Sequence, residues 1–166
     1  MPPYYDVYGI SKHRDRKTIE CFLSAFCHRG EVESQEGTVI GMLANEKYRV
    51  AEIELPVNTL TEVVDFGLQN SGYGFSFYIA SGLINVKMVI LKFTYDGLII
   101  FGVSIEEMDD NWVDNLPKAR ELAVKIARLT QSYKTSIQFE CGTADDAGEF
   151  EEDHQLFSHL NNDSAC

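Results

Sequence analysis

The chain has 166 residues, an apolar fraction of 45%, a charged fraction of 24% and a formal net charge of -12, a composition typical of a soluble globular protein. This charge argues against nucleic acid and anionic membranes as partners, because both require a basic protein surface. No apolar run approaches the ~18 residues that span a bilayer, and the N-terminus does not resemble a signal peptide, so we expect a cytoplasmic protein.

In chain order, a strand and a helix are predicted first. Residues 4–10 have the composition of a strand. Asp15 is predicted to cap the helix that follows, and Gly30 to end it. The apolar residues of this helix recur at i, i+3, i+4 and i+7, which predicts one buried face. That face consists of Ile19, Phe22, Leu23 and Phe26.

Two strands, residues 38–43 and 48–55, are predicted next. The second alternates apolar and acidic side chains, as a strand with one wet face does. Asn58 is predicted to cap a second helix, and Gly67 and Asn70 are the candidates to end it. The apolar stripe of this helix consists of Leu60, Val63, Val64 and Leu68. An aromatic-rich strand over residues 72–80 leads into the centre of the sheet.

Residues 84–105 predict a long β-hairpin that turns at Asp96 and Gly97. An Asp-Gly pair favours a type I′ turn, because both of its central residues have positive φ. This turn would place Tyr95 opposite Leu98. We therefore expect the hairpin to supply two central strands of the sheet.

Both strands of this hairpin are apolar on both faces, so both faces are predicted to be covered. Lys92 and Thr94 are polar and lie close to the turn. We expect these two side chains to mark a corner of the hairpin that contacts water.

After the hairpin, Pro117 suits the first turn of a third helix, and residues 137–141 predict a last strand. The order is β-α-β-β-α-β-β-β-α-β with an acidic C-terminal tail. Strands joined by short turns imply a mainly antiparallel sheet with helices packed on one face, the α+β class. We expect residues 1–141 to form a single domain. Residues 142–166, which hold seven acids and no lysine or arginine, are predicted to be a short helix or disordered.

A cluster of basic side chains lies where the first helix begins: Lys12, His13, Arg14, Arg16 and Lys17. Positive charge at a helix N-terminus opposes the helix dipole, whereas the free backbone N–H groups there can bind an anion. One interpretation is therefore a site for a phosphate or carboxylate ligand. The other is a solvated surface turn that lies against the acidic tail.

Acidic side chains surround the single tryptophan after the hairpin: Glu106, Glu107, Asp109, Asp110, Trp112 and Asp114. An aromatic anchor ringed by acids is typical of an interface for a basic partner. In the alternative interpretation, the tryptophan folds back over the open end of the core. The acids do not follow the order of a calcium-binding loop, so no metal is predicted there.

The remaining reactive side chains provide no catalytic signature, and neither a cofactor nor a metal is predicted. His154 and His159 are five residues apart, unlike the i, i+4 pair of a helical zinc site. The cysteines lack metal-ligand spacing and are predicted to be buried thiols. They are Cys21, Cys27, Cys141 and Cys166.

These patterns favour a small acidic module that binds another protein through the loop around Trp112 and through the tail. A toxin-neutralising immunity protein or an acidic chaperone for a secreted effector would fit this description, because each masks a basic partner. The competing prediction is a small-molecule site, binding or catalytic, for an anionic ligand at the basic N-terminus of the first helix. An open edge strand at residues 137–141 would also allow a homo-oligomer.

Overall fold

The structure is a computed structural model, and it describes residues 3–27, 38–44, 53–57, 59–152 and 157–160. The strands in these ranges form one sheet with the order β3-β2-β4-β5-β6-β1-β7-β8, and every neighbouring pair is antiparallel. Their bounds are β1 Tyr4–Ser11, β2 Thr38–Ala44, β3 Ile53–Val57, β4 Tyr73–Ala80, β5 Met88–Phe93, β6 Ile99–Glu106, β7 Lys134–Phe139 and β8 Phe157–Leu160.

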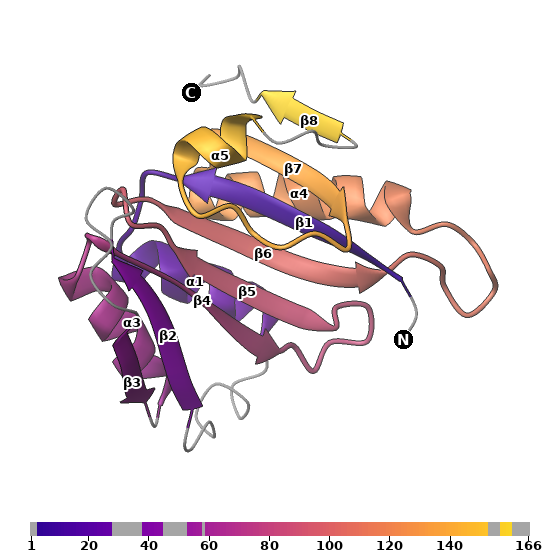
Figure 1. Cartoon of the computed structure of the whole chain (residues 1–166). Helices are drawn as coiled ribbons and strands as arrows, with labels where there is room; N and C mark the ends of the chain where they lie inside the picture. The colour runs from indigo at the N-terminus through magenta and orange to yellow at the C-terminus, as the bar shows by residue number, and fades with distance from the viewer. Residues whose placement is uncertain (1–2, 28–37, 45–52, 58, 153–156, 161–166) are drawn as a thin grey trace.

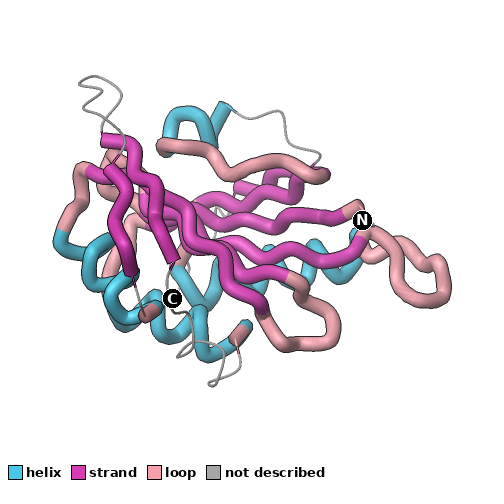
Figure 2. Tube along the Cα trace, turned by 60° about the horizontal axis from the view of Figure 1, so that its bottom comes forward, coloured by secondary structure: helices cyan, strands magenta, loops and turns pink. Residues whose placement is uncertain are grey.

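Three helices cover one face of this sheet and a fourth lies on the other (Figure 1). The first three are α1 (Arg16–Phe26), α3 (Leu60–Gln69) and α4 (Leu116–Thr130), and the fourth is α5 (Ala147–Glu152). Figure 2 shows the strands between the short helix on one side and the other helices on the opposite side. The predicted α+β class and the mainly antiparallel sheet are confirmed, and the predicted element order holds as far as β7. The tail adds α5, which lies on the face opposite the other helices, and the strand β8, which was not predicted. No helix in the described ranges is long and apolar enough to cross a bilayer.

The main core lies between the sheet and α1, α3 and α4. Phe22 of α1 packs on Phe101 with ring centroids 4.9 Å apart, and Phe75 stacks on Phe93 at 4.8 Å. The predicted stripe of α1 is buried in this core, and the stripe of α3 is buried except for its partly exposed last leucine. Burial of large aromatic side chains supplies most of the stabilisation of such a core.

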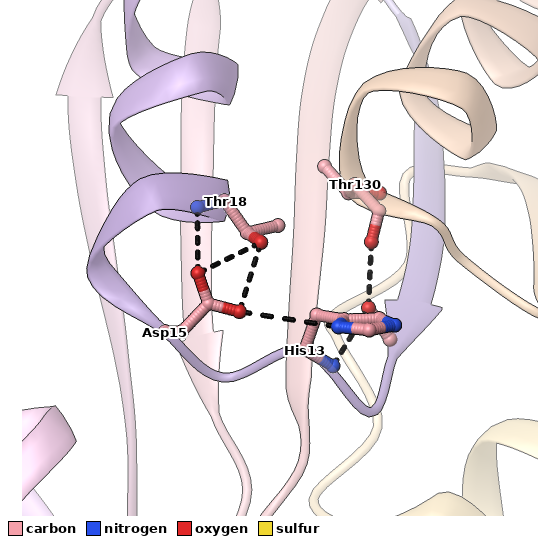
Figure 3. Close-up of polar contacts among 5 residues, drawn as sticks. His13, Asp15, Thr18 and Thr130 are labelled. Atoms are coloured by element: carbon pink, nitrogen blue, oxygen red, sulfur yellow. Dashed lines mark hydrogen bonds and ion pairs between the residues drawn. The ribbon is translucent and has the colours of Figure 1, made fainter.

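Helix α1 begins as predicted, because the Asp15 carboxylate accepts a hydrogen bond from the Thr18 backbone N–H at 2.9 Å (Figure 3). The helix ends earlier than predicted, with Cys27 as its C-cap, and Gly30 lies outside the described residues. Asn58 also lies outside them, and the residue that caps α3 is Thr59. Of the two candidates to end α3, Asn70 is its C-cap, and Gly67 lies within the helix.

The hairpin of β5 and β6 forms, but its predicted turn is wrong by one residue. Phe93 pairs with Ile99, and the Thr94 backbone pairs with Leu98. Of the turn residues, only Gly97 has positive φ, at 90°, so the type I′ geometry is absent. The Thr94 hydroxyl accepts a hydrogen bond from the Leu98 N–H at 2.9 Å, which stabilises a three-residue loop in place of the two-residue turn.

Both faces of this hairpin are buried, as predicted. The prediction that Lys92 and Thr94 contact water is wrong. Lys92 is 6% exposed and Thr94 is 0% exposed. The Lys92 ammonium contacts the carboxylate of Asp145, which lies in the segment between β7 and α5. That segment runs over the same face of the sheet as α5. It therefore covers Lys92 and Thr94, which were predicted to contact water.

Helix α4 is followed by its C-cap residue Gln131, whose φ of 51° and ψ of 39° lie in the left-handed region. Glycine has no Cβ to oppose this conformation, so Gln131→Gly is expected to raise the free energy of unfolding by about 0.5–1 kcal/mol. Urea unfolding of the purified variant measures the change. Gln131→Ala keeps the Cβ and should bring no gain, and an equal gain from alanine would contradict this explanation.

Candidate functional site

The segment between β6 and α4, residues 107–115, is called the acidic loop below. It projects beyond the end of the sheet, at the right of Figure 1. Its base is closed by backbone hydrogen bonds from Glu107 N–H to Pro3 O at 2.9 Å and from Asn115 N–H to Glu107 O at 2.7 Å. An isolated β-bridge between Met108 and Asp114 continues this pairing. The loop is therefore a defined projection with a fixed base.

Asp109 organises the tip of the acidic loop. Its Oδ1 accepts hydrogen bonds from the backbone N–H groups of Asn111 at 2.8 Å and Val113 at 2.9 Å. These bonds, that from Val113 first, lower the pKa of Asp109 below its usual range, so the carboxylate is ionised at neutral pH. The Trp112 N–H donates to Asp109 O at 2.9 Å.

Trp112 points into solvent. Its exposed fraction is 85%, and its φ of 61° is in the left-handed region, which is rare for a large side chain. The interpretation in which the tryptophan folds back over the core is wrong, because the turn around Asp109 directs it away. A large exposed aromatic side chain on an ordered loop is a feature of protein-binding surfaces.

Two of the predicted acids hold the loop in place. Asp114 accepts hydrogen bonds from the buried Tyr5 hydroxyl at 3.0 Å and from the Leu116 N–H at 2.8 Å. Burial and this carboxylate raise the pKa of Tyr5 to about 12. Glu106 forms an ion pair with Lys87 at 2.8 Å, which raises the pKa of that lysine.

Of the other two acids of the loop, Asp110 is exposed and Glu107 is partly exposed. Glu107 and Asp110 form no side-chain hydrogen bond or ion pair with any residue that the structure describes. Their charges therefore remain available on the loop that carries Trp112. The predicted set divides into three side chains that build the loop and three that a partner could contact.

Exposed apolar side chains gather at the same end of the sheet as the acidic loop. In the acidic loop they are Met108, Trp112 and Val113, and on the neighbouring strand ends and turns they are Tyr78, Ile84, Met88 and Phe139. Ile84 is 96% exposed. One further exposed large apolar residue in the described ranges, Val124, lies on α4. Apolar surface collected in one place, rather than scattered singly, marks an interaction surface.

A groove of about 560 Å³ lies between the acidic loop, residues 84–87 and helix α4. Acidic and basic side chains both line it, including Glu106, Asp109, Asp110, Lys87, Lys118 and Lys125. Lys87 is paired with Glu106, and the Lys125 ammonium lies 4.7 Å from the centre of the Phe26 ring. Two of the lysines in the groove thus already interact with side chains of the protein itself.

Arg14, from the predicted anion-binding cluster, is a structural residue. Its guanidinium donates five hydrogen bonds, all to backbone carbonyls at the end of α3 and at the hairpin turn. The group also lies 5.0 Å from the centre of the Phe93 ring. Burial lowers the pKa of Arg14 to about 10, so the group stays charged at neutral pH. It has no donor left for a ligand.

The other members of the cluster lie on the surface around the start of α1. Arg16 pairs with Asp65, and the Lys12 ammonium lies 5.5 Å from the centre of the Tyr133 ring. His13 Nδ1 is 4.0 Å from Asp15, whose carboxylate already caps the helix (Figure 3). Anion binding by Lys12, His13, Arg16 and Lys17 stays a prediction.

Two further predictions are corrected. Cys21 and Cys141 are exposed and Cys27 is half-buried, so these three side chains are not buried as predicted, and Cys166 lies outside the described residues. Strand β7 is not an open edge, because β1 and β8 flank it. A homo-oligomer remains a prediction, but pairing through an open edge of β7 no longer supports it. Among the described residues, no group of three or more histidine, cysteine or acidic side chains is placed to hold a metal.

No protein-family model matches this chain, and no curated protein matches it. Among solved structures, the chain is similar to one from the 1.75 Å crystal structure of the toxic C-terminal tip of CdiA from Pseudomonas aeruginosa in complex with immune protein. The match covers 98% of this chain and 99% of the other, with 15% identity and a TM-score of 0.41. Such a TM-score is too low to bear on the fold or function of this chain.

Proposed function

We propose that this protein binds a basic protein partner through a surface formed by the acidic loop and the adjoining groove. The observation that carries the proposal is Trp112, which is 85% exposed on the same loop as Glu107 and Asp110, two acids whose side chains have no partner among the described residues. Tryptophan is enriched at the centres of protein interfaces, and flanking charges select and steer the partner.

Charge supports a basic partner over an acidic one. The chain carries a formal charge of -12, and the loop that holds Trp112 also holds the carboxylates of Glu107 and Asp110. A positively charged surface would therefore be attracted over a long range and would find unpaired acids at the contact. Size and charge together would suit a protein that masks a basic partner, such as a toxin-neutralising immunity protein or a chaperone for a secreted effector.

Site-specific photo-crosslinking tests the proposal. A benzophenone amino acid at position 112 should give a discrete crosslinked product in a lysate of the source cells, and mass spectrometry should identify a basic protein in it. The same amino acid at Gln69 is the matched control, because this exposed residue ends α3, which lies on the opposite side of the molecule from the acidic loop (Figure 1). If the same product forms equally from both positions, the acidic loop is not the binding surface and the proposal is contradicted.

Reversing the charges of Glu107 and Asp110 provides the second test. Glu107→Lys combined with Asp110→Lys should weaken capture of the crosslinked partner by about tenfold or more, because both acids are lost without disturbing the turn at Asp109. Glu20→Lys combined with Glu152→Lys changes the net charge equally on exposed positions outside the surface. Equal loss in both variants would show a nonspecific charge effect and contradict the proposed site.

A further inference from the structure

A second cavity, of about 370 Å³, lies on the face of the sheet that α5 only partly covers. Its lining comes from the ends of β1, β4, β5 and β6 and from the segment that follows β7, and it includes Tyr4, Asp6, Tyr8, Tyr78, Ser104 and Glu140. Lys87 lines both this cavity and the groove beside the acidic loop, so the two hollows adjoin. A cavity of this size accommodates a small molecule or a long side chain.

Asp6 is a half-buried carboxylate in this cavity that lacks a cation. The Ser104 hydroxyl and the backbone N–H of Cys141 donate hydrogen bonds to it. No lysine or arginine among the described residues lies within 4.0 Å of it, and Lys87, the nearby lysine, is paired with Glu106. Burial, and to a lesser extent the neighbouring Glu140, raise the pKa of Asp6, which a bound cation would reverse.

Three tyrosines, Tyr4, Tyr8 and Tyr78, line the cavity together with this carboxylate. Tyr8 is fixed by a hydrogen bond from its hydroxyl to Cys141 O at 3.0 Å, whereas Tyr78 is 50% exposed and borders the opening. Aromatic faces beside carboxylates favour organic cations, and a guanidinium group suits them best because it stacks on rings and donates several hydrogen bonds in one plane.

We propose that this cavity receives the guanidinium group of an arginine of the protein partner, with Asp6 as its counter-ion and Tyr78 as a stacking surface. The inference rests on the proposed function for the source of the arginine. Beyond the proposed function, the inference names the guanidinium group as the chemical group by which the partner is recognised. The cavity lies beside the groove that the partner would occupy, so one partner can reach both.

Titration followed by ¹⁵N–¹H NMR tests the cavity without any partner. N-acetyl-arginine methylamide should shift the amide signals of Ser104 and Cys141 in a saturable way. N-acetyl-citrulline methylamide has nearly the same shape without the charge and should leave them unchanged. Equal shifts from both probes, or equal affinity for N-acetyl-lysine methylamide, would overturn the assignment of a guanidinium site.

Matched variants assign the site to its residues. Asp6→Asn should weaken arginine amide binding by about tenfold or more, since it removes a charge-assisted hydrogen-bond acceptor. Asp65→Asn removes one negative charge on α3 and should have no effect. Tyr78→Leu, at an exposed position, should also weaken binding, so the assignment stays testable if Asp6→Asn does not fold. Unchanged affinity in a folded Asp6→Asn protein, or in Tyr78→Leu, would overturn the proposal.

The same variants distinguish the cavity from the proposed function. Asp6→Asn should reduce recovery of the partner that crosslinks at position 112 by about tenfold. If the arginine amide binds but partner recovery does not change, the partner's arginine is the wrong occupant. If no partner crosslinks at position 112 while the titration succeeds, the proposed function fails and the chemistry of the cavity stands.

Discussion

Replacing Arg14 by methionine is expected to lower the free energy of unfolding by about 3 kcal/mol, because several half-buried carbonyls lose a charged donor at once. The affected carbonyls belong to Gly67, Asn70, Thr94 and Leu98. They join the end of α3 to the turn of the central hairpin. Equilibrium urea unfolding, followed by circular dichroism, measures the loss.

Two further substitutions make this prediction specific. Arg14→Lys keeps the charge but lacks the planar set of donors, so a loss of about 2 kcal/mol is expected. Arg16→Met removes a half-exposed ion pair with Asp65 and should cost no more than about 0.5 kcal/mol. Similar losses for Arg14→Met and Arg16→Met would contradict the structural role of Arg14.

Asp145→Ala is expected to lower the free energy of unfolding by about 2 kcal/mol, because it leaves the buried Lys92 ammonium without its partner. The pair links the central strand β5 to the segment that leads into α5. Asp145 is itself half-exposed, so water offsets part of the full cost of an unpaired buried charge. Thermal and urea unfolding at neutral pH provide the measurement.

A compensating change separates the charge effect from lost packing. Lys92→Met fills a similar volume without a charge, so in the Asp145→Ala background it should restore most of the lost stability. Lys92→Met alone should be close to neutral for the same reason. If the double variant is as unstable as Asp145→Ala, then the ion pair is not what the alanine removes.

Local patterns predicted the parts of the fold that depend on neighbours in the chain. The cap at Asp15, the stripe from Ile19 to Phe26 and the element order as far as β7 follow from spacings of a few residues, and all three agree with the structure. The turn of the hairpin failed because an Asp-Gly pair fits both a two-residue turn and a three-residue loop. The Thr94 hydroxyl, which the pattern ignores, favours the longer loop.

Contacts between distant segments explain the other errors. Arg14 resembled a surface cation in sequence because its carbonyl partners lie 53 to 84 residues away. Lys92 was predicted to contact water because its partner Asp145 lies 53 residues further along the chain, beyond the reach of a local pattern. The candidate site was only half predictable for the same reason, since composition identified the acids around Trp112 but not the cavity at Asp6, which strands far apart in sequence build together.

The closed base of the acidic loop has a consequence for how this protein could diversify. Because backbone bonds at Glu107 and Asn115 seal the loop where it leaves the sheet, residues 110–113 can be exchanged without touching the core. Related chains could therefore acquire different partners by substitution at this tip while their scaffold stays constant. The same arrangement makes the loop a suitable position for grafting a foreign recognition sequence.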